Sequence, residues 1–309
     1  MAKTNATNYA TIVIPCRDCA ATIDITLLSL RAAIKRFQGE ATPSRKIEVV
    51  LVANGTTTEF KNYFRSLEDV TTIESDVGRS KARNAGLQYA KMNGSKFVLF
   101  IDADTVVADD FLASMLEALE APARPAAVAA RLEPTVIGWN VARTTLRSLA
   151  FAQTKGTYIS LFRESSLGVF VDTAASGFSV EALIAIGGFD ETLIRQEDMD
   201  LSIRMAKAGY RFGVVRKAHA VKIVDDSVPG QSLIRAFHSG YHLAALYKKW
   251  RPGDSTLSRL NSVRRNALID FNYAKSANHS FSERFFVGSF LLSNRLGNLA
   301  GVLIFSSEP

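Results

Sequence analysis

Cysteine is scarce in this sequence: among 309 residues only Cys16 and Cys19 occur. Two cysteines are too few for a disulfide framework, and they supply only half of the ligands of a four-cysteine zinc site. Their C-x-x-C spacing between an apolar run and a helical pattern is typical of thioredoxin-like motifs, but no other feature supports thiol chemistry. A redox function is therefore a minor alternative.

Membrane-targeting features are also lacking. The opening MAKTNATNYA has no basic segment followed by a long apolar run, so it predicts neither a secretory signal nor an N-terminal anchor. Residues 285–305 match a membrane span in length, but Asn294, Arg295 and Asn298 lie near the middle, where such groups are costly. We expect a cytoplasmic protein whose C-terminal helices pack on the core or make peripheral contact with the inner face of a membrane.

Acidic residues are slightly outnumbered. The 37 basic and 30 acidic side chains give a formal net charge of +7, which favours anionic partners such as nucleotides, phosphorylated substrates or a membrane surface. The basic residues are dispersed and form no recognition motif, so nucleic-acid binding is not supported. A hydrophobic fraction of 47% is enough for a sizeable core.

Short apolar, β-branched runs alternate with helical patterns in the first hundred residues. Ile23, Leu27 and Leu30 recur at helical spacing, and a second helical pattern ends at Asn93-Gly94. This alternation predicts an α/β fold with a mostly parallel sheet flanked by helices. The predicted strands are residues 11–15, 47–53, 70–73 and 96–102.

The rhythm changes near residue 122, where prolines bracket a predicted strand at 126–132. We expect a donor half at about residues 1–121 and an acceptor half at about 122–228. The acceptor half contains a helix that ends at Gly209 and two predicted strands, 210–215 and 220–224. Residues 229–309 have helical patterns throughout and are predicted to form a helical C-terminal region.

Two carboxylates follow the apolar strand FVLFI. Asp102 and Asp104 are separated by one small residue, and ligands of open α/β sheets bind beyond the carboxyl ends of strands. Paired oxygen ligands suit a hard divalent cation that bridges a diphosphate. A turn followed by a helix cap is the structural alternative.

Three acidic residues open the helical segment after GGFDE: Glu197, Asp198 and Asp200. Acidic residues in a first turn commonly complement the helix dipole, which explains Glu197 or Asp200 without any chemistry. A carboxylate held at a helix start beside a cleft can also act as a general base. Asp198 is the candidate for that role.

Basic residues open another predicted helix, where Gly78 precedes Arg79, Lys81 and Arg83. Cations in a first turn oppose the helix dipole, and backbone N–H groups at such an end point outward toward anions. The pattern favours a phosphate ligand, although a solvated helix end is an equal alternative.

These motifs, in this order, resemble the family 2 glycosyltransferases of the GT-A fold. The resemblance covers about residues 10–225 and rests on TIVIPCRD, LVANGTTTEF, GRSKARNAGL, FIDADT and the GGFDE…QEDMDLSIRMAKAGYRF segment. It implies an inverting transferase that uses a nucleoside-diphosphate sugar. In such an enzyme Pro15 and Asp18 would border the nucleobase pocket, Asn54 would meet the base, and Arg83 would lie by the nucleotide.

The resemblance also implies roles for the acidic residues. Asp102 would face the ribose or a metal, Asp104 would bind the metal, Mn²⁺ or Mg²⁺, and Asp198 would deprotonate the acceptor hydroxyl. The chain departs from the family pattern at Ala53, where aspartate is frequent, so the choice between uridine and guanosine stays open. Arg17 replaces a common tyrosine, and a Q-x-x-R-W motif is absent after Asp198, which argues against a processive synthase.

The sequence therefore predicts metal-assisted transfer of one sugar to a carbohydrate or lipid-linked hydroxyl acceptor, in cell-surface polysaccharide or glycolipid assembly. The main alternative is a catalytically inactive nucleotide-sugar-binding scaffold in a membrane-associated complex. A nucleotidyltransferase is a weaker rival because its glycine-rich opening loop is missing.

Overall fold

The computed structural model describes residues 8–17, 19, 22–40, 45–121, 125–137, 171–225, 231–261, 263–264 and 281–306. The described residues form two compact units: the first holds those up to 133 and those from 171 to 223, and the second holds 134–137 and those from 224 onward. The first unit holds most of the sheet with its helices, and the second holds the described helices that follow Val224. The sequence-predicted boundaries at residues 121 and 228 stay predictions.

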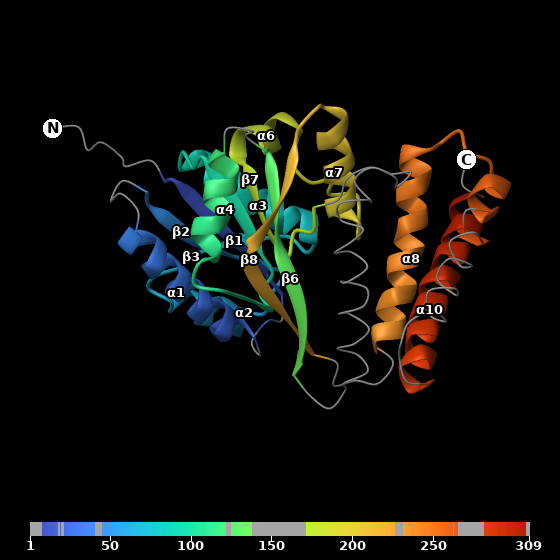
Figure 1. Ribbon diagram of the computed structural model, residues 1–309, viewed down its shortest axis with the longest axis horizontal. Coiled ribbons are helices and arrows are strands. Elements are labelled where there is room, and N and C mark those ends of the chain that lie inside the picture. Colours follow the sequence, from blue (N-terminus) through green and yellow to red (C-terminus); the bar gives the residue numbers. More distant parts are fainter. Residues whose placement is uncertain are drawn as a thin grey trace. The chain divides into compact units, whose positions relative to one another are not determined.

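A mixed eight-stranded sheet forms the centre of the first unit, with the strand order β3-β2-β1-β4-β7-β6-β8-β5 (Figure 1). The strands β3, β2, β1 and β4 are mutually parallel, whereas β7 is antiparallel to β4 and β6, and β5 is antiparallel to β8. This confirms the predicted α/β fold class. The bounds are β1 Ala10–Cys16, β2 Ile47–Asn54, β3 Thr71–Ser75, β4 Phe97–Ile101, β5 Thr105–Val107, β6 Ala127–Ile137, β7 Ala175–Ser179 and β8 Phe212–Asp225.

The strand β8 corrects one prediction from the sequence, which divided it into two strands at 210–215 and 220–224. Residues 212–225 form one continuous strand. The polar run between the two predicted strands resembles a turn, but it holds no glycine or proline. Its Arg216, Lys217 and His219 are exposed while Ala218 is fully buried. Along the strand, Lys217 and His219 lie on one face and Arg216 lies on the face of the buried Ala218, so one unbroken strand accommodates all three polar side chains.

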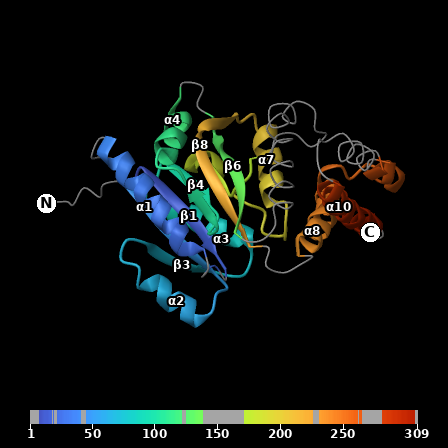
Figure 2. The same cartoon turned by 60° about the horizontal axis from the view of Figure 1, so that its bottom comes forward.

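Helices cover both faces of the sheet (Figure 2). Helix α3 (Arg79–Met92) packs on the parallel strands, where Gly86 lies so close to Val13 that a Cβ would collide with it. On the opposite face, Leu119 of α4 (Phe111–Glu120) contacts Gly177 beside Leu99, and α1 (Ile23–Glu40) packs on α4. The other helices in the described part of this unit are α2 (Thr58–Arg65), α6 (Val180–Ala185) and α7 (Glu197–Lys207).

The strand order indicates that a ligand site lies at the carboxyl edge of the parallel strands. From β1 the chain moves outward to β2 and β3 and then crosses to β4 on the other side of β1. The carboxyl ends of β1 and β4 therefore flank a topological switch point, which is the place where open α/β sheets bind ligands. Cys16 and Asp102 stand at those two ends. Cys16 is joined to Cys19 in a disulfide.

Two long helices, α8 (Gln231–Trp250) and α10 (Phe281–Ser306), run side by side in the second unit (Figure 1). Glycines make the close approach: a Cβ at Gly240 would collide with the carbonyl of Asn294, and one at Gly297 with that of Phe237. The Asn294 amide donates to the carbonyl of Ala236, 3.0 Å away, and Asn298 is buried. The Asn294 amide in the middle of α10 thus joins the two helices. Within the described residues, no helix combines the length and apolar character that crossing a membrane requires.

Candidate functional site

The two carboxylates of the D-x-D segment lie in a tight turn between β4 and β5. The Asp102 amide donates to the carbonyl of Ala174, and the Thr105 amide donates to the carbonyl of Asp102, each at 3.0 Å. From the neighbouring α1, the Thr26 hydroxyl donates to the carbonyl of Ala103 at 3.0 Å. Backbone and side-chain bonds therefore fix this turn from three directions.

Lys222 lies between the two carboxylates. Its Nζ donates to Asp102 Oδ2 at 2.5 Å and lies 3.0 Å from Asp104 Oδ1, a contact that is an ion pair without hydrogen-bond geometry. Burial alone would raise the pKa of Asp102, but the charges of Lys222 and Arg83 outweigh it and hold that pKa well below its usual range. Burial likewise opposes the charge on Lys222, yet Asp102 and Asp104 raise its pKa. Asp102 is therefore an anion and Lys222 a cation at neutral pH.

Arg83 links this turn to the start of α7. Its guanidinium donates to Asp102 Oδ1 at 3.2 Å and to Glu197 Oε1 at 2.7 Å. The Arg83 and Glu197 side chains are only 5% and 4% exposed, which makes this a buried pair. The first turn of α7 is thereby connected to the D-x-D turn through one side chain.

Asp198 follows Glu197, and its environment is the reverse of that of Asp102. Burial raises its pKa well above the ordinary value, the negative charges of Glu197 and Asp172 raise it further, and Arg83 opposes this only in part. Its Oδ1 accepts from the Met199 amide at 2.8 Å. A raised pKa makes this carboxylate a stronger base than an ordinary aspartate. Asp200 is different, because it pairs within α7 with Arg204 at 2.8 Å.

The residues expected around the nucleotide are only partly described. Pro15 lies near the carboxyl end of β1, beyond Ala10–Val13, the residues of β1 that pair with β4, so its missing N–H breaks no bond to that strand. Asn54 ends β2, and its Oδ1 accepts from the Gly78 amide at 2.8 Å, which ties β2 to the start of α3. Asp18 lies outside the described residues. The binding roles of all three stay predictions.

A divalent cation does not fit the described side chains as the sequence predicted. Both oxygens of Asp102 already accept from cationic groups, Arg83 and Lys222, and Lys222 also neutralises Asp104. In the described part of the chain, no group of three or more His, Cys, Asp or Glu is arranged to hold a metal ion. We derive no step through a metal, and the predicted metal role of Asp102 and Asp104 stays a prediction.

Two residues of this site, Lys222 and Asp172, were not predicted from the sequence. Lys222 lies in the run AVKIV. A single lysine in an apolar strand does not indicate a functional role until β8 is known to pair with β5. Asp172 precedes the buried strand β7. The residue is half-buried, and its carboxylate accepts a hydrogen bond from the Ala174 amide at 2.8 Å. A carboxylate directly before an apolar strand start was the available, weak signal.

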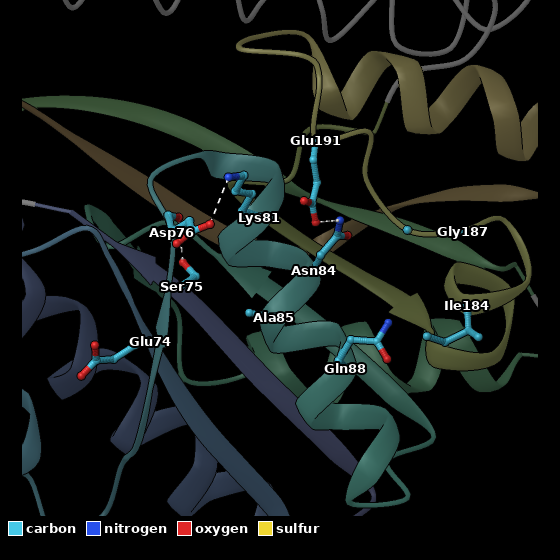
Figure 3. A pocket seen from close by; sticks show the side chains of 11 residues that line it. Glu74, Ser75, Asp76, Lys81, Asn84, Ala85, Gln88, Ile184, Gly187 and Glu191 are labelled. Atoms are coloured by element: carbon cyan, nitrogen blue, oxygen red, sulfur yellow. Dashed lines mark hydrogen bonds and ion pairs between the residues drawn. The ribbon is translucent and has the colours of Figure 1, made fainter.

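A cavity of about 450 Å³ lies elsewhere, beside α3. Figure 3 shows Lys81 pointing toward Asp76 and Asn84 toward Glu191 along its wall. Of the basic residues predicted to favour a phosphate, Lys81 lines it, whereas Arg83 and the acidic candidates Asp102, Asp104 and Asp198 do not. The cavity is therefore separate from the group of charges at the D-x-D turn.

Comparisons with known proteins agree with this architecture. Residues 11–187 match the family described as glycosyl transferase family 2. The succinoglycan biosynthesis protein ExoA of Rhizobium meliloti (strain 1021) is 28% identical over 218 residues, which are 68% of this chain and 62% of that protein. The chain thus spans about 62% of the length of this relative.

Two solved structures share the fold. The mannosyltransferase PcManGT from Pyrobaculum calidifontis, in complex with GDP-Man and Mn²⁺, aligns with a TM-score of 0.52 at 18% identity over 97% of this chain and 75% of that one. TarS of S. aureus aligns with a TM-score of 0.50 at 14% identity over 94% of this chain and 54% of that one. Because the family match covers more than half of the chain, the chain belongs to glycosyl transferase family 2.

Proposed function

We propose that this glycosyltransferase moves one sugar from a nucleoside-diphosphate donor to a hydroxyl acceptor with inversion, and that Asp198 is the general base. The donor class is supported by the family and by the GDP-Man bound to the similar mannosyltransferase. The base role is supported by the raised pKa of Asp198.

One observation carries the proposal: a continuous line of ion pairs joins the D-x-D turn to the start of α7. It runs from Lys222 through Asp102 and Arg83 to Glu197, the neighbour of Asp198. A donor held at the carboxyl edge of β4 and a base at the start of α7 are therefore parts of one connected group of charges. Transfer chemistry needs this proximity, because the acceptor oxygen must lie between base and sugar.

In the proposed reaction the acceptor hydroxyl gives its proton to the Asp198 carboxylate. Its oxygen forms a bond to the anomeric carbon while the bond between that carbon and the diphosphate oxygen breaks. The nucleoside diphosphate leaves with the bonding electron pair. Attack from the face opposite the leaving group inverts the sugar carbon.

The name of one relative supports the biological setting that we propose. ExoA is a succinoglycan biosynthesis protein, and we extend this to cell-surface polysaccharide or glycolipid assembly with a carbohydrate or lipid-linked acceptor. The absence of Q-x-x-R-W after Asp198 supports addition of a single sugar. The charges at Asp198, Glu197 and Asp102 support an active enzyme over an inactive scaffold, since buried carboxylates without use cost stability.

The test uses Asp198→Asn, with nucleotide release from UDP- and GDP-sugars measured alongside calorimetric binding of UDP and GDP. We expect turnover to fall by about 10²–10⁴-fold, the usual contribution of a general base, with nucleotide affinity unchanged. Glu181→Gln is the matched control, because this exposed carboxylate also lies in the first turn of a helix.

The outcomes separate the two candidate functions. Near-normal turnover in Asp198→Asn removes the base role from this residue. Nucleotide binding without turnover of any tested donor by the wild-type protein would favour the scaffold instead.

We also propose that α10 makes the peripheral membrane contact and that the protein acts at the cytoplasmic side of that membrane. Leu292, Leu296, Leu299 and Leu303 are exposed at 59%, 49%, 37% and 54% and recur at helical spacing. An exposed apolar stripe of this kind is typical of a surface that contacts a membrane or another protein.

Vesicle co-sedimentation tests this contact, with vesicles of zwitterionic lipid and of mixed zwitterionic and anionic lipid. Leu296→Glu with Leu303→Glu should release the protein into the supernatant. Leu28→Glu, at an equally exposed leucine of α1, should not. Equal sedimentation of the double variant and the wild-type protein contradicts the membrane role of this stripe.

A further inference from the structure

A lysine side chain of the protein itself, Lys222, supplies a positive charge at the D-x-D turn. β8 pairs antiparallel with β5 in a register that sets Lys222 opposite Thr105, and the Ile223 amide donates to the carbonyl of Asp104 at 2.7 Å. The backbone next to the ammonium is thus bonded to the backbone of the turn. Lys222 reaches both carboxylates because strand pairing holds it there, rather than through a chance surface contact.

The charges around the turn are already balanced by side chains. Asp102 lies between Arg83 and Lys222, and Asp104 faces Lys222. A divalent cation bound to both carboxylates would have to displace the ammonium or stand next to it, and like charges in close contact repel. The described side chains provide no third acidic or imidazole ligand that would offset this repulsion.

The charged side chains at the turn are only partly buried. The side chains of Lys222, Asp102 and Asp104 are 26%, 27% and 37% exposed, so solvent reaches this group of charges. An ammonium has three N–H donors, so it can bond to a carboxylate and still donate to a phosphate oxygen. Lysine binds phosphate as a compact point charge, whereas a metal would need several oxygen ligands in fixed geometry.

We propose that the Lys222 ammonium takes the place of a divalent cation in this enzyme and neutralises the departing nucleoside diphosphate directly. The inference rests on the proposed function. When the bond from the anomeric carbon to the diphosphate oxygen breaks, the negative charge that develops on that oxygen forms an ion pair with Lys222. Asp102 and Asp104 hold the ammonium in position, which is a different use of the D-x-D carboxylates from metal ligation.

The experiment measures UDP and GDP binding by calorimetry in EDTA and in excess Mn²⁺, together with Mn²⁺ binding by electron paramagnetic resonance. The wild-type protein should bind one of the two nucleotides equally well in both conditions and should bind no Mn²⁺ at this site. Lys222→Met should weaken that binding in EDTA by about 10- to 100-fold, the range expected for losing a charged hydrogen bond. Lys222→Arg should retain most of it, because the charge is kept.

Lys222→Ala gives a second, opposite readout. Without the ammonium, Asp102 and Asp104 are left with an uncompensated charge and more room, so this variant should gain a Mn²⁺ signal that the wild-type protein lacks. Lys217→Met, at an exposed lysine of the same strand, is the control that should change neither measurement. Unchanged thermal unfolding of each variant in the absence of nucleotide shows that the sheet is intact.

The outcomes distinguish this inference from the proposed function. Nucleotide binding by the wild-type protein only in the presence of Mn²⁺ overturns the role of Lys222 and leaves the transferase proposal standing. Unchanged binding by Lys222→Met in EDTA also overturns it. If the wild-type protein binds neither nucleotide in either condition, the proposed function itself fails.

Discussion

Asp102 and Asp198 are both largely enclosed carboxylates of one charge network, yet the protein moves their pKa values in opposite directions. Burial disfavours the charged form of each. At Asp102 two cations, Lys222 and Arg83, overcome that effect and lower the pKa. At Asp198 two carboxylates, Glu197 and Asp172, add to it and raise the pKa.

This contrast teaches that the neighbours of a carboxylate assign its role more clearly than its own position in a motif. A group that stays charged at every physiological pH can hold a cation but cannot exchange a proton. A group whose pKa is raised binds a proton more tightly. The network thus holds Asp102 as a fixed anion and makes Asp198 the more basic of the two carboxylates.

The most disruptive change removes the residue that joins the two regions. Arg83→Gln would leave the nearly buried Glu197 without its partner, and breaking a buried pair from one side typically costs about 3–5 kcal/mol. Urea denaturation at neutral pH measures this loss in the free energy of unfolding. Lys81→Gln, in an exposed pair on the same helix, should change it by less than about 0.5 kcal/mol. A similarly small change in Arg83→Gln would show that the two regions are not coupled.

A smaller loss is expected for Asp102→Asn, at about 1–3 kcal/mol, because the neutral amide still offers an oxygen to Lys222 and Arg83. The Asp102 pKa is lowered on folding, so its contribution to stability is present above the ordinary value of 3.8 and is lost as the pH falls below it. Urea denaturation at neutral and acidic pH should therefore show a deficit that shrinks on acidification. A deficit that is the same at both pH values would contradict the lowered pKa.

Asp198→Asn should change stability in the opposite direction. The folded protein binds a proton at Asp198 more tightly than the unfolded chain does, so wild-type stability falls as the pH rises from the ordinary value of 3.8 through the raised pKa. Asparagine carries no charge and avoids this fall. The variant should be more stable than the wild-type protein above that window and no more stable below it. Thermal melts across the pH range provide the measurement.

The smallest effect is a shift in the pH dependence of turnover. Asp172 contributes to the raised pKa of Asp198 through its negative charge, so Asp172→Asn should move the acidic limb of the pH–rate profile to lower pH. The same substitution should leave nucleotide binding unchanged. An acidic limb that does not move would assign proton transfer to another group.

Much of the fold was predictable because its signals are local. Continuous apolar runs gave the buried parallel strands, and Asn93-Gly94 marked the end of α3, whose cap is Asn93. The prediction of two separate strands at 210–215 and 220–224 was wrong for the same reason. Arg216, Lys217 and His219 resemble a loop when only their neighbours in sequence are considered. Their exposure on an unbroken strand is set by pairing with distant segments.

The residues of the site also fall into those that local sequence predicts and those that only the fold reveals. Asp102, Asp104 and Asp198 could be proposed from their places after a strand and at a helix start. Lys222 could not, because its significance depends on the register between β8 and β5. The buried Arg83–Glu197 pair also required the fold, since each residue alone resembles an ordinary charge in a first turn.

The pairing of Lys222 with the D-x-D turn also has a consequence for synthesis of the chain. Lys222 follows Asp102 by 120 residues, and domains fold as their segments leave the ribosome, N-terminal part first. The parallel strands can assemble early, but their two acidic side chains lack this counter-charge until β8 has been made and has joined β5. On the function proposed for Lys222, a chain that ends before β8 would keep the D-x-D turn but lack the side chain that neutralises the leaving diphosphate.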